Sequence, residues 1–151
     1  MPLRALALLR LLWFAVVANC CSARHAMQNA KVAIIDDDAS WCRALTRMLR
    51  GVGIDATAYG SAESFLADRA AADFACLLVD IQLGGRSGLE MFRELRGLAM
   101  RTPVIFITAY EEPGQRDEAI QGGCAGFFRK SDPGSVLVRA IRSAAPGVVA
   151  P

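Results

Sequence analysis

The sequence has almost no histidine and very little lysine. The only histidine among 151 residues is His25, which precedes the first strand-like run at Lys31. Catalysis by a serine or cysteine that depends on an imidazole is therefore excluded from the rest of the chain, as is a histidine-ligated zinc site. Of the 17 cationic side chains only Lys31 and Lys130 are lysines, so a lysine at a particular position carries information.

Paired cysteines and a strong charge excess are also missing. The five cysteines show no C-x-x-C pair, and their odd number argues against a disulfide framework. Cys76 lies inside an apolar run and is interpreted as a small core residue. The formal net charge is only +2, which is not the basic excess of a nucleic-acid-binding surface, so no direct contact with nucleic acid is expected.

What is present is a regular alternation of short apolar runs with segments of helical spacing. The length corresponds to one domain, and the alternation predicts an α/β fold with a single doubly wound parallel sheet. The expected strands are Lys31–Ile35, Asp55–Tyr59, Ala75–Asp80, Val104–Thr108 and Gly126–Phe128. The expected helices are Trp41–Arg50, a helix capped by Ser61, Leu89–Arg96, Gly114–Gln121 and a last helix starting at Asp132–Pro133.

Two helix starts carry specific expectations. Ser61 is expected to be an N-cap, although the segment Ser61–Ser64 is not a strict capping box because its fourth residue is serine. Pro133 is expected in the first turn of the last helix, where its missing N–H group costs nothing.

Four of the apolar runs end on polar residues of different kinds. Asp36, Asp37 and Asp38 follow the first run, and Asp80 ends the third. Thr108 ends the fourth run and Lys130 follows the fifth. In an open parallel sheet the ligand site lies beyond the carboxyl ends of the strands. The sequence therefore predicts carboxylates, a hydroxyl and an ammonium in one crevice, suited to a divalent cation and a phosphoryl group.

Each of these residues also has a simpler interpretation. The aspartate triplet could cap a helix, Asp80 could be a turn residue, Thr108 an ordinary β-branched strand residue, and Lys130 a solvated charge. Three adjacent carboxylates repel one another, however, and a hard cation with oxygen ligands offsets that repulsion. It is the joint order of these residues at successive strand ends that favours a phosphoryl site.

The chain resembles the receiver domains of bacterial two-component response regulators, the CheY-like superfamily, from Lys31 to about Ala145. The segments that carry the resemblance are Val32–Asp38, Leu77–Leu83, Pro103–Ala109 and Gly126–Lys130, and Gly60–Leu66 resembles the second helix of FixJ-type receivers. The resemblance implies a flavodoxin-like fold with strand order 2-1-3-4-5 and five flanking helices. The receiver domain is expected to span 27–145, and a short tail, 146–151, follows it.

The resemblance also implies roles for individual residues. Asp80 would be the phosphoryl acceptor and the modified residue, with a histidine kinase or histidine phosphotransfer protein as donor. Mg²⁺ would be bound by Asp37 and Asp80, with help from Asp36 through water and from the Gln82 backbone carbonyl. Lys130 would pair with the phosphoryl oxygens. The residues that change conformation would be Thr108 and Phe127.

Self-phosphorylation and slow self-dephosphorylation are the only reactions expected, so the chain is not predicted to be a turnover enzyme. Because no effector domain is recognisable, the output is expected to be docking to an unknown downstream protein, around the fourth helix, fifth strand and fifth helix. The sequence departs from the common pattern at Gly84, Tyr110 and Ser131. Two alternatives stay open, a receiver-like binding module that works without phosphorylation, and a phosphohydrolase with an aspartate nucleophile. Gln82 stands where such a hydrolase has its second aspartate.

Residues 1–26 form an apolar extension without any acidic residue. Arg4 and Arg10 precede the apolar run Leu11–Ala18, a pattern typical of a secretory signal, but the run is short for a membrane span. Export signal, membrane anchor and translated upstream sequence with a start at Met27 all remain possible interpretations. A phosphoryl site needs cytosolic phosphate donors, which favours the last interpretation and a cytoplasmic location. Membrane contact is expected only if the extension is real.

Overall fold

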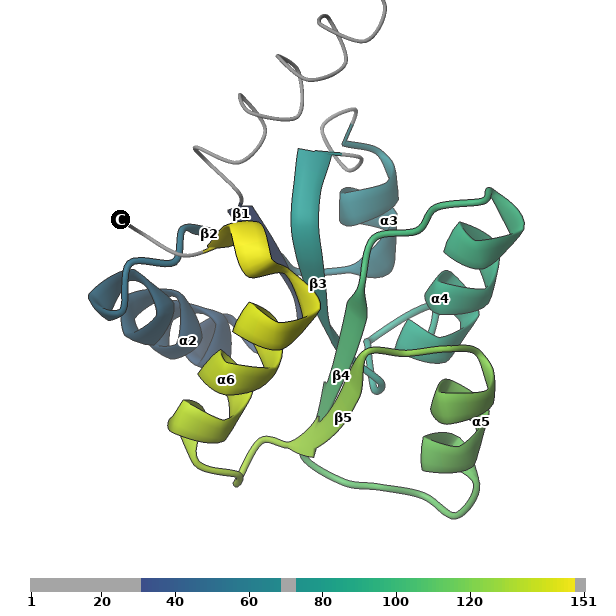
Figure 1. Ribbon diagram of the computed structural model, residues 1–151. Helices are drawn as coiled ribbons and strands as arrows, with labels where there is room; N and C mark the ends of the chain where they lie inside the picture. Colours follow the sequence, from purple (N-terminus) through teal and green to yellow (C-terminus); the bar gives the residue numbers. More distant parts are fainter. Residues whose placement is uncertain (1–30, 69–72, 149–151) are drawn as a thin grey trace, which may run out of the picture.

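The computed structural model describes residues 31–68 and 73–148, and these residues form a five-stranded parallel sheet (Figure 1). The strand order is β2-β1-β3-β4-β5, and all neighbouring strands run parallel. Within the described part of the chain, five α-helices flank the sheet. The doubly wound arrangement with strand order 2-1-3-4-5 is thus confirmed.

Strands and helices alternate with bounds close to those that the apolar pattern predicts. The strands are β1 (Lys31–Ile35), β2 (Ala56–Tyr59), β3 (Phe74–Asp80), β4 (Val104–Thr108) and β5 (Gly126–Arg129). The helices are α2 (Ala39–Gly51), α3 (Ala62–Leu66), α4 (Gly88–Gly97), α5 (Gln115–Gln121) and α6 (Gly134–Ala144), followed by a 3₁₀ turn at Pro146–Val148.

Helices cover both faces of the sheet. Figure 1 shows α2 and α6 on one face and α3, α4 and α5 on the other. Successive side chains of β1 point to opposite faces, so Ile34 packs in the α2–α6 core and Ile35 in the core beneath α3, α4 and α5. Because both faces are covered, β3 and β4 are apolar on both faces up to their last residues, Asp80 and Thr108, rather than alternating with polar residues. Cys76 is fully buried in the α2–α6 core, as predicted.

Two helix starts differ from expectation. Ser61 caps α3 as predicted, but a reciprocal capping box also forms, because the Ser64 hydroxyl accepts from the Ser61 N–H while the Ser64 N–H donates to the Ser61 hydroxyl. Serine therefore replaces the usual Glu or Gln. Pro133 is the N-cap of α6 and not part of its first turn, since its ψ of 133° is extended and the helix begins at Gly134.

The predictions for residues 1–26 fall outside the described residues, and the three interpretations of this extension stay predictions. Within 31–68 and 73–148, every helix is too short or too polar to cross a bilayer. Past α6, Val148 is buried in the same core as Ile141. The first three residues of the expected tail are therefore a 3₁₀ turn that packs against the domain.

Candidate functional site

The carboxyl ends of β1 and β3 bring three aspartates together. Asp36 and Asp37 follow β1, and Asp80 is the last residue of β3, which pairs directly with β1. One carboxylate oxygen from each aspartate lies within 4.8 Å of the others. Asp36 is 2% exposed and Asp80 5% exposed, whereas Asp37 is exposed to solvent. The predicted acidic cluster therefore exists, and Asp37 is its solvent-facing member.

Lys130 links the two buried carboxylates. Its Nζ atom lies 2.6 Å from Asp36 Oδ2 and 2.8 Å from Asp80 Oδ2. Burial alone would lower the pKa of Lys130, but its bonds to the two carboxylates raise it above the ordinary value. Burial also raises the pKa of Asp36, against the effect of its bond to Lys130. The ammonium is thus held in its charged form between two acids.

The other oxygen of each buried carboxylate accepts from a backbone N–H group. Asp36 Oδ1 accepts from Asp38 N at 2.8 Å, and Asp80 Oδ1 accepts from Gln82 N at 3.0 Å. Both carboxylates are therefore oriented by a lysine on one side and a backbone amide on the other. This pair of contacts fixes where their oxygen atoms point, as a binding or reacting group requires.

The loop after Asp80 approaches the site closely because α4 starts at a glycine. A Cβ atom at Gly88 would lie 2.1 Å from the Asp80 carbonyl oxygen, and the Gly88 N–H donates to the Ile81 carbonyl at 3.0 Å. Any larger residue would push α4 away from the acceptor strand. Gly84, in the same loop, lies beside Asp37, since a Cβ atom added at this glycine would lie 3.2 Å from Asp37 Oδ2.

The third aspartate of the triplet caps a helix. The Asp38 carboxylate accepts from Ser40 N at 2.9 Å and from Trp41 N at 3.0 Å, at the start of α2. The bond from Trp41, together with that from Ser40, lowers the pKa of Asp38. Asp38 thus takes the capping position, while Asp36 and Asp37 lie in the acidic cluster with Asp80.

This division predicts different effects at neighbouring positions. Asp38→Ala is expected to lower the melting temperature by a few degrees, because two backbone N–H groups lose their acceptor, whereas Asp38→Asn keeps an acceptor and most of the stability. The pKa of Asp38 is lower in the folded protein than in the unfolded chain. The stability that aspartate adds over alanine is therefore present at a pH above the unfolded-state pKa, and it is lost as the pH falls through the folded-state pKa. Thermal melts of both variants across acidic pH measure this, and equal losses would contradict a capping role.

Thr108 and Phe127 lie on the neighbouring strands β4 and β5. Thr108 is fully buried, and its hydroxyl donates to the Tyr110 carbonyl at 2.5 Å. Phe127 is 8% exposed and packs against Phe106 with 6.3 Å between ring centroids. The Lys130 N–H donates to the Thr108 carbonyl at 2.8 Å, which ties the predicted hydroxyl and ammonium positions together through the backbone.

Sequence reasoning missed the residues that cover these side chains. The guanidinium of Arg116 lies 4.4 Å from the Phe127 ring centroid and forms an ion pair with Glu111, which also contacts Arg129 at 3.5 Å. The Trp41 ring, which the sequence placed only at the start of the expected helix Trp41–Arg50, lies 5.6 Å from Lys130 Nζ. The only sequence signal for the contact of Arg116 with Glu111 was their opposite charge at a spacing of five residues. This signal is weak as long as the fold is unknown.

Comparison with known proteins agrees with this geometry. The chain is 36% identical over 106 residues to Nodulation protein W of Bradyrhizobium diazoefficiens, with 70% of this chain and 47% of that protein covered. It is 34% identical to the response regulator protein TodT of Pseudomonas putida, with 80% and 54% covered. The crystal structure of FixJ-N superposes with a TM-score of 0.71 at 32% identity, covering 82% of this chain and 99% of that one.

Residues 32–142 match the response regulator receiver domain family, and the chain belongs to this family. It is a receiver domain of the kind found in two-component systems, in which phosphorylation and Mg²⁺ binding at an acidic pocket are typical. The chemotaxis protein CheY4 of Vibrio cholerae shares the fold, with a TM-score of 0.68 at 21% identity. The chain spans about half the length of the curated relatives it matches.

Proposed function

We propose that this receiver accepts a phosphoryl group on Asp80 from a phosphohistidine and passes the signal to another protein by a conformational change. The donor is a histidine kinase or a histidine phosphotransfer protein, which places the reaction in the cytoplasm. The observation that carries the proposal is the position of Lys130, whose Nζ bridges Asp36 and Asp80 in a cluster that Asp37 completes. One buried cation alone does not balance three carboxylates, so the cluster favours a further cation.

The donor set fits Mg²⁺. Three carboxylates within 4.8 Å of one another offer the oxygen ligands that this small, hard cation prefers, and the exposed Asp37 leaves room for its water ligands. We assign Asp37, Asp80 and the Gln82 backbone carbonyl as direct ligands, with Asp36 acting through water. When bound, the ion neutralises the carboxylates and the charge on the incoming phosphoryl oxygens.

In the transfer step, an Asp80 carboxylate oxygen forms a bond to phosphorus while the bond between phosphorus and the donor imidazole breaks. The electron pair of the broken bond stays on the imidazole nitrogen, which takes up one proton from solvent, so the donor leaves as neutral histidine. Lys130 is already within hydrogen-bond distance of Asp80 and compensates charge on the phosphoryl oxygens. The acyl phosphate adds about −1.5 to −2 charge to this pocket.

The response begins at Thr108. To reach a phosphoryl oxygen its hydroxyl must leave the Tyr110 carbonyl, to which it donates at 2.5 Å. The bond to the Tyr110 carbonyl therefore opposes the movement of the Thr108 hydroxyl. The charge-assisted bond to the phosphoryl group is stronger and offsets its loss. Phe127 lies on the adjacent strand and changes its packing against Phe106 with this movement. The proposed output surface is formed by α5, β5 and α6, where a downstream protein docks.

Exposure to acetyl phosphate and Mg²⁺ tests this function. The protein is expected to gain one phosphoryl group per chain, acid-labile and slowly lost, as measured by intact mass against time. Rapid turnover of a phosphate ester would instead indicate a phosphohydrolase. An unchanged mass over the whole incubation would indicate a binding module that works without phosphorylation.

Mg²⁺ is expected to raise the melting temperature, because an ion that binds only the folded protein stabilises it. At 100 times its dissociation constant the gain is about 2.7 kcal/mol. Asp37→Ala should lose most of this increment, since it removes the exposed ligand. Asp38→Asn is the matched control one residue away and should retain it. Calorimetry with and without Mg²⁺ measures both, and an equal increment in wild type and Asp37→Ala would remove the metal assignment.

A further inference from the structure

The loop that follows the acceptor strand contains a pair of glycines. It spans residues 81–87, between β3 and α4, and Gly84 and Gly85 stand at its middle. Glycine has more backbone freedom to lose on folding than any other residue. The proposed metal ligand Gln82 belongs to this loop, and Gly84 lies beside Asp37. Because the glycine pair gives the segment little rigidity of its own, contacts with neighbouring elements decide where it lies.

The two ends of the loop are anchored, but its middle is not. Ile81 and Leu83 are buried in the core beneath α3, α4 and α5, and Ser87 is the N-cap of α4. Between these anchors, Gly84 and Gly85 are exposed to solvent. The position of the glycine pair therefore depends on contacts made at the surface.

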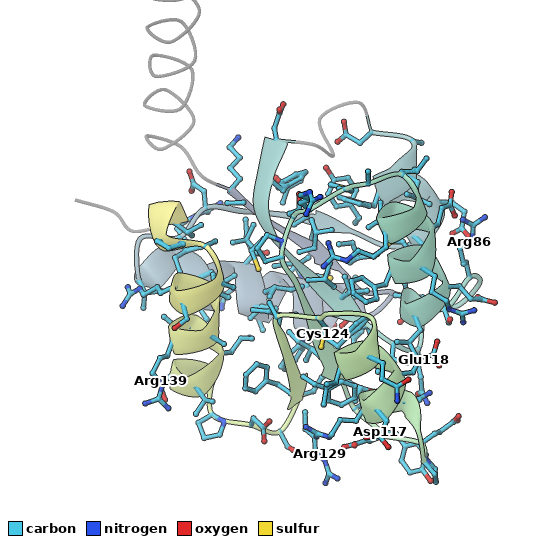
Figure 2. The ribbon with its side chains drawn as sticks, turned by 45° about the vertical axis from the view of Figure 1, so that its right-hand side comes forward. Arg86, Asp117, Glu118, Cys124, Arg129 and Arg139 are labelled. Carbon is cyan, nitrogen blue, oxygen red and sulfur yellow. The ribbon has the colours of Figure 1, made fainter. Side chains whose placement is uncertain are left out.

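Glu63, in the first turn of α3, makes such a contact. A Cβ atom added at Gly85 would lie 3.7 and 3.8 Å from its two carboxylate oxygens, so the carboxylate lies against the loop backbone. The pKa of Glu63 is lowered, first by its own backbone N–H and then by the Ser61 hydroxyl and the Arg86 N–H. The Arg86 side chain forms an ion pair with Glu94 of α4, at the outer edge of the domain (Figure 2). The middle of the loop is thus held from both α3 and α4.

We propose that Glu63 is a positioning residue for the metal site, and that its contact with the glycine pair keeps the loop in the arrangement that binds Mg²⁺. This role rests on the proposed function and deepens it. Gly85 directly follows Gly84, so a shift of the pair would open the space beside Asp37 and move the Gln82 carbonyl. Among the described residues, Glu63 is not part of the acidic cluster, and it acts on the ion through the loop.

A loop without this contact would bind Mg²⁺ more weakly, because only part of the molecules would hold the binding arrangement. The apparent dissociation constant rises by the inverse of that fraction. A fraction of about one fifth gives about fivefold weaker binding, the size expected for the loss of one hydrogen bond. Saturating Mg²⁺ restores the arrangement, so the rate of phosphorylation should recover at high Mg²⁺ concentration.

An acidic residue in the first turn of a helix also has a simpler role. It stabilises the helix through the free N–H groups at the helix start. If this were the only role of Glu63, its removal would lower the melting temperature equally with and without Mg²⁺, and the affinity for the ion would not change. The affinity for Mg²⁺ therefore distinguishes a positioning residue from a helix-stabilising one.

Calorimetric titration of the whole chain with Mg²⁺ tests the proposal. Glu63→Ala is expected to bind the ion about fivefold more weakly than wild type. Glu63→Gln removes the same charge but keeps an oxygen that can accept from the Arg86 N–H, so its affinity should stay within about twofold of wild type. Labelling of Glu63→Ala by acetyl phosphate should be slow at low Mg²⁺ and reach the wild-type rate at saturating Mg²⁺.

Glu118→Ala is the matched control, because it also removes an exposed carboxylate, one that pairs with Arg93 at 3.1 Å. Figure 2 shows Glu118 on α5, apart from Arg86. Its affinity for Mg²⁺ should equal that of wild type, and melting temperatures without Mg²⁺ establish that all variants fold.

Two results would overturn the role of Glu63 while leaving the proposed function intact. One is equal affinity of wild type and Glu63→Ala for Mg²⁺. The other is an equal loss of affinity in Glu63→Ala and Glu63→Gln, which would mean that only the charge matters. If the wild type itself neither bound Mg²⁺ nor took up a phosphoryl group, the proposed function would fail together with this role.

Discussion

The Asp80→Asn variant is expected to accept no phosphoryl group from acetyl phosphate, whereas the wild type gains one per chain. An amide is a poor nucleophile, but it matches the carboxylate in shape and retains an oxygen that can accept from the Gln82 N–H, as Asp80 Oδ1 does at 3.0 Å. Lys130 keeps its contact with Asp36 at 2.6 Å, so the pocket should retain its arrangement. Intact mass after incubation with Mg²⁺ and acetyl phosphate measures the difference.

Asp38→Asn is the control for this experiment, because it removes a nearby carboxylate that caps α2 and takes no part in the acidic cluster. It should be labelled as wild type is. If Asp80→Asn still carries the label, or if the label maps to Asp36 or Asp37, the assignment of the acceptor is wrong. A melting curve of Asp80→Asn separates loss of the nucleophile from loss of the fold.

Lys130→Met is expected to be the most destabilising substitution at the site when Mg²⁺ is withheld. It keeps the length of the side chain and its position near Trp41 but leaves the buried Asp36 and Asp80 carboxylates without their common cation. Removing one partner of a buried ion pair costs about 3 kcal/mol or more. Urea unfolding without Mg²⁺ measures the loss, and saturating Mg²⁺ should recover much of it.

The pH dependence of that loss has a definite sign. Burial raises the pKa of Asp36 even beside Lys130, and without the lysine the pKa of this carboxyl rises further. When the pKa of a carboxyl is higher in the folded protein than in the unfolded chain, the folded protein is favoured at a pH below the unfolded-state pKa. This advantage is lost as the pH rises through the folded-state pKa. The deficit of Lys130→Met should therefore shrink in acid. A loss that is small and independent of pH would mean that the bridge contributes little.

Combining the two substitutions separates the contacts of Lys130. In Lys130→Met/Asp80→Asn only Asp36 remains as an unpaired buried acid, so part of the lost stability should return. The non-additivity of the double-mutant cycle measures the coupling of Lys130 with Asp80 alone. A fully additive pair would show that the 2.8 Å contact carries no net energy in the folded protein.

The cation above Phe127 has consequences for the proposed switch. Arg116 lies over the ring and is held by Glu111, whose pKa is lowered chiefly by its bond with Arg116. Any repacking of Phe127 must also move this guanidinium or leave it without its ring contact. In the proposed switch, the loop between β4 and α5 would therefore move together with Thr108 and Phe127.

Much of this domain could be predicted from its sequence because the signals are local. The apolar runs ending at Ile35, Asp80 and Thr108 are strands in the structure with those same ends. A buried parallel strand is apolar on both faces, so a polar residue marks its end whatever the neighbouring strands do. Ser61 could be predicted as a cap because this signal, a serine directly before a helix, is also local in the sequence. The bond that Ser64 returns depends on side-chain geometry, which the motif pattern does not include.

What the sequence by itself determined was the order of elements and the kinds of side chain at the strand ends, since both depend on hydrophobic period and on residues adjacent in the chain. Only the tertiary structure decided how those side chains meet. It placed Lys130 between Asp36 and Asp80 and set Arg116 over Phe127. These contacts join residues far apart in the chain, and strand order with side-chain packing, not local pattern, fixes their distances.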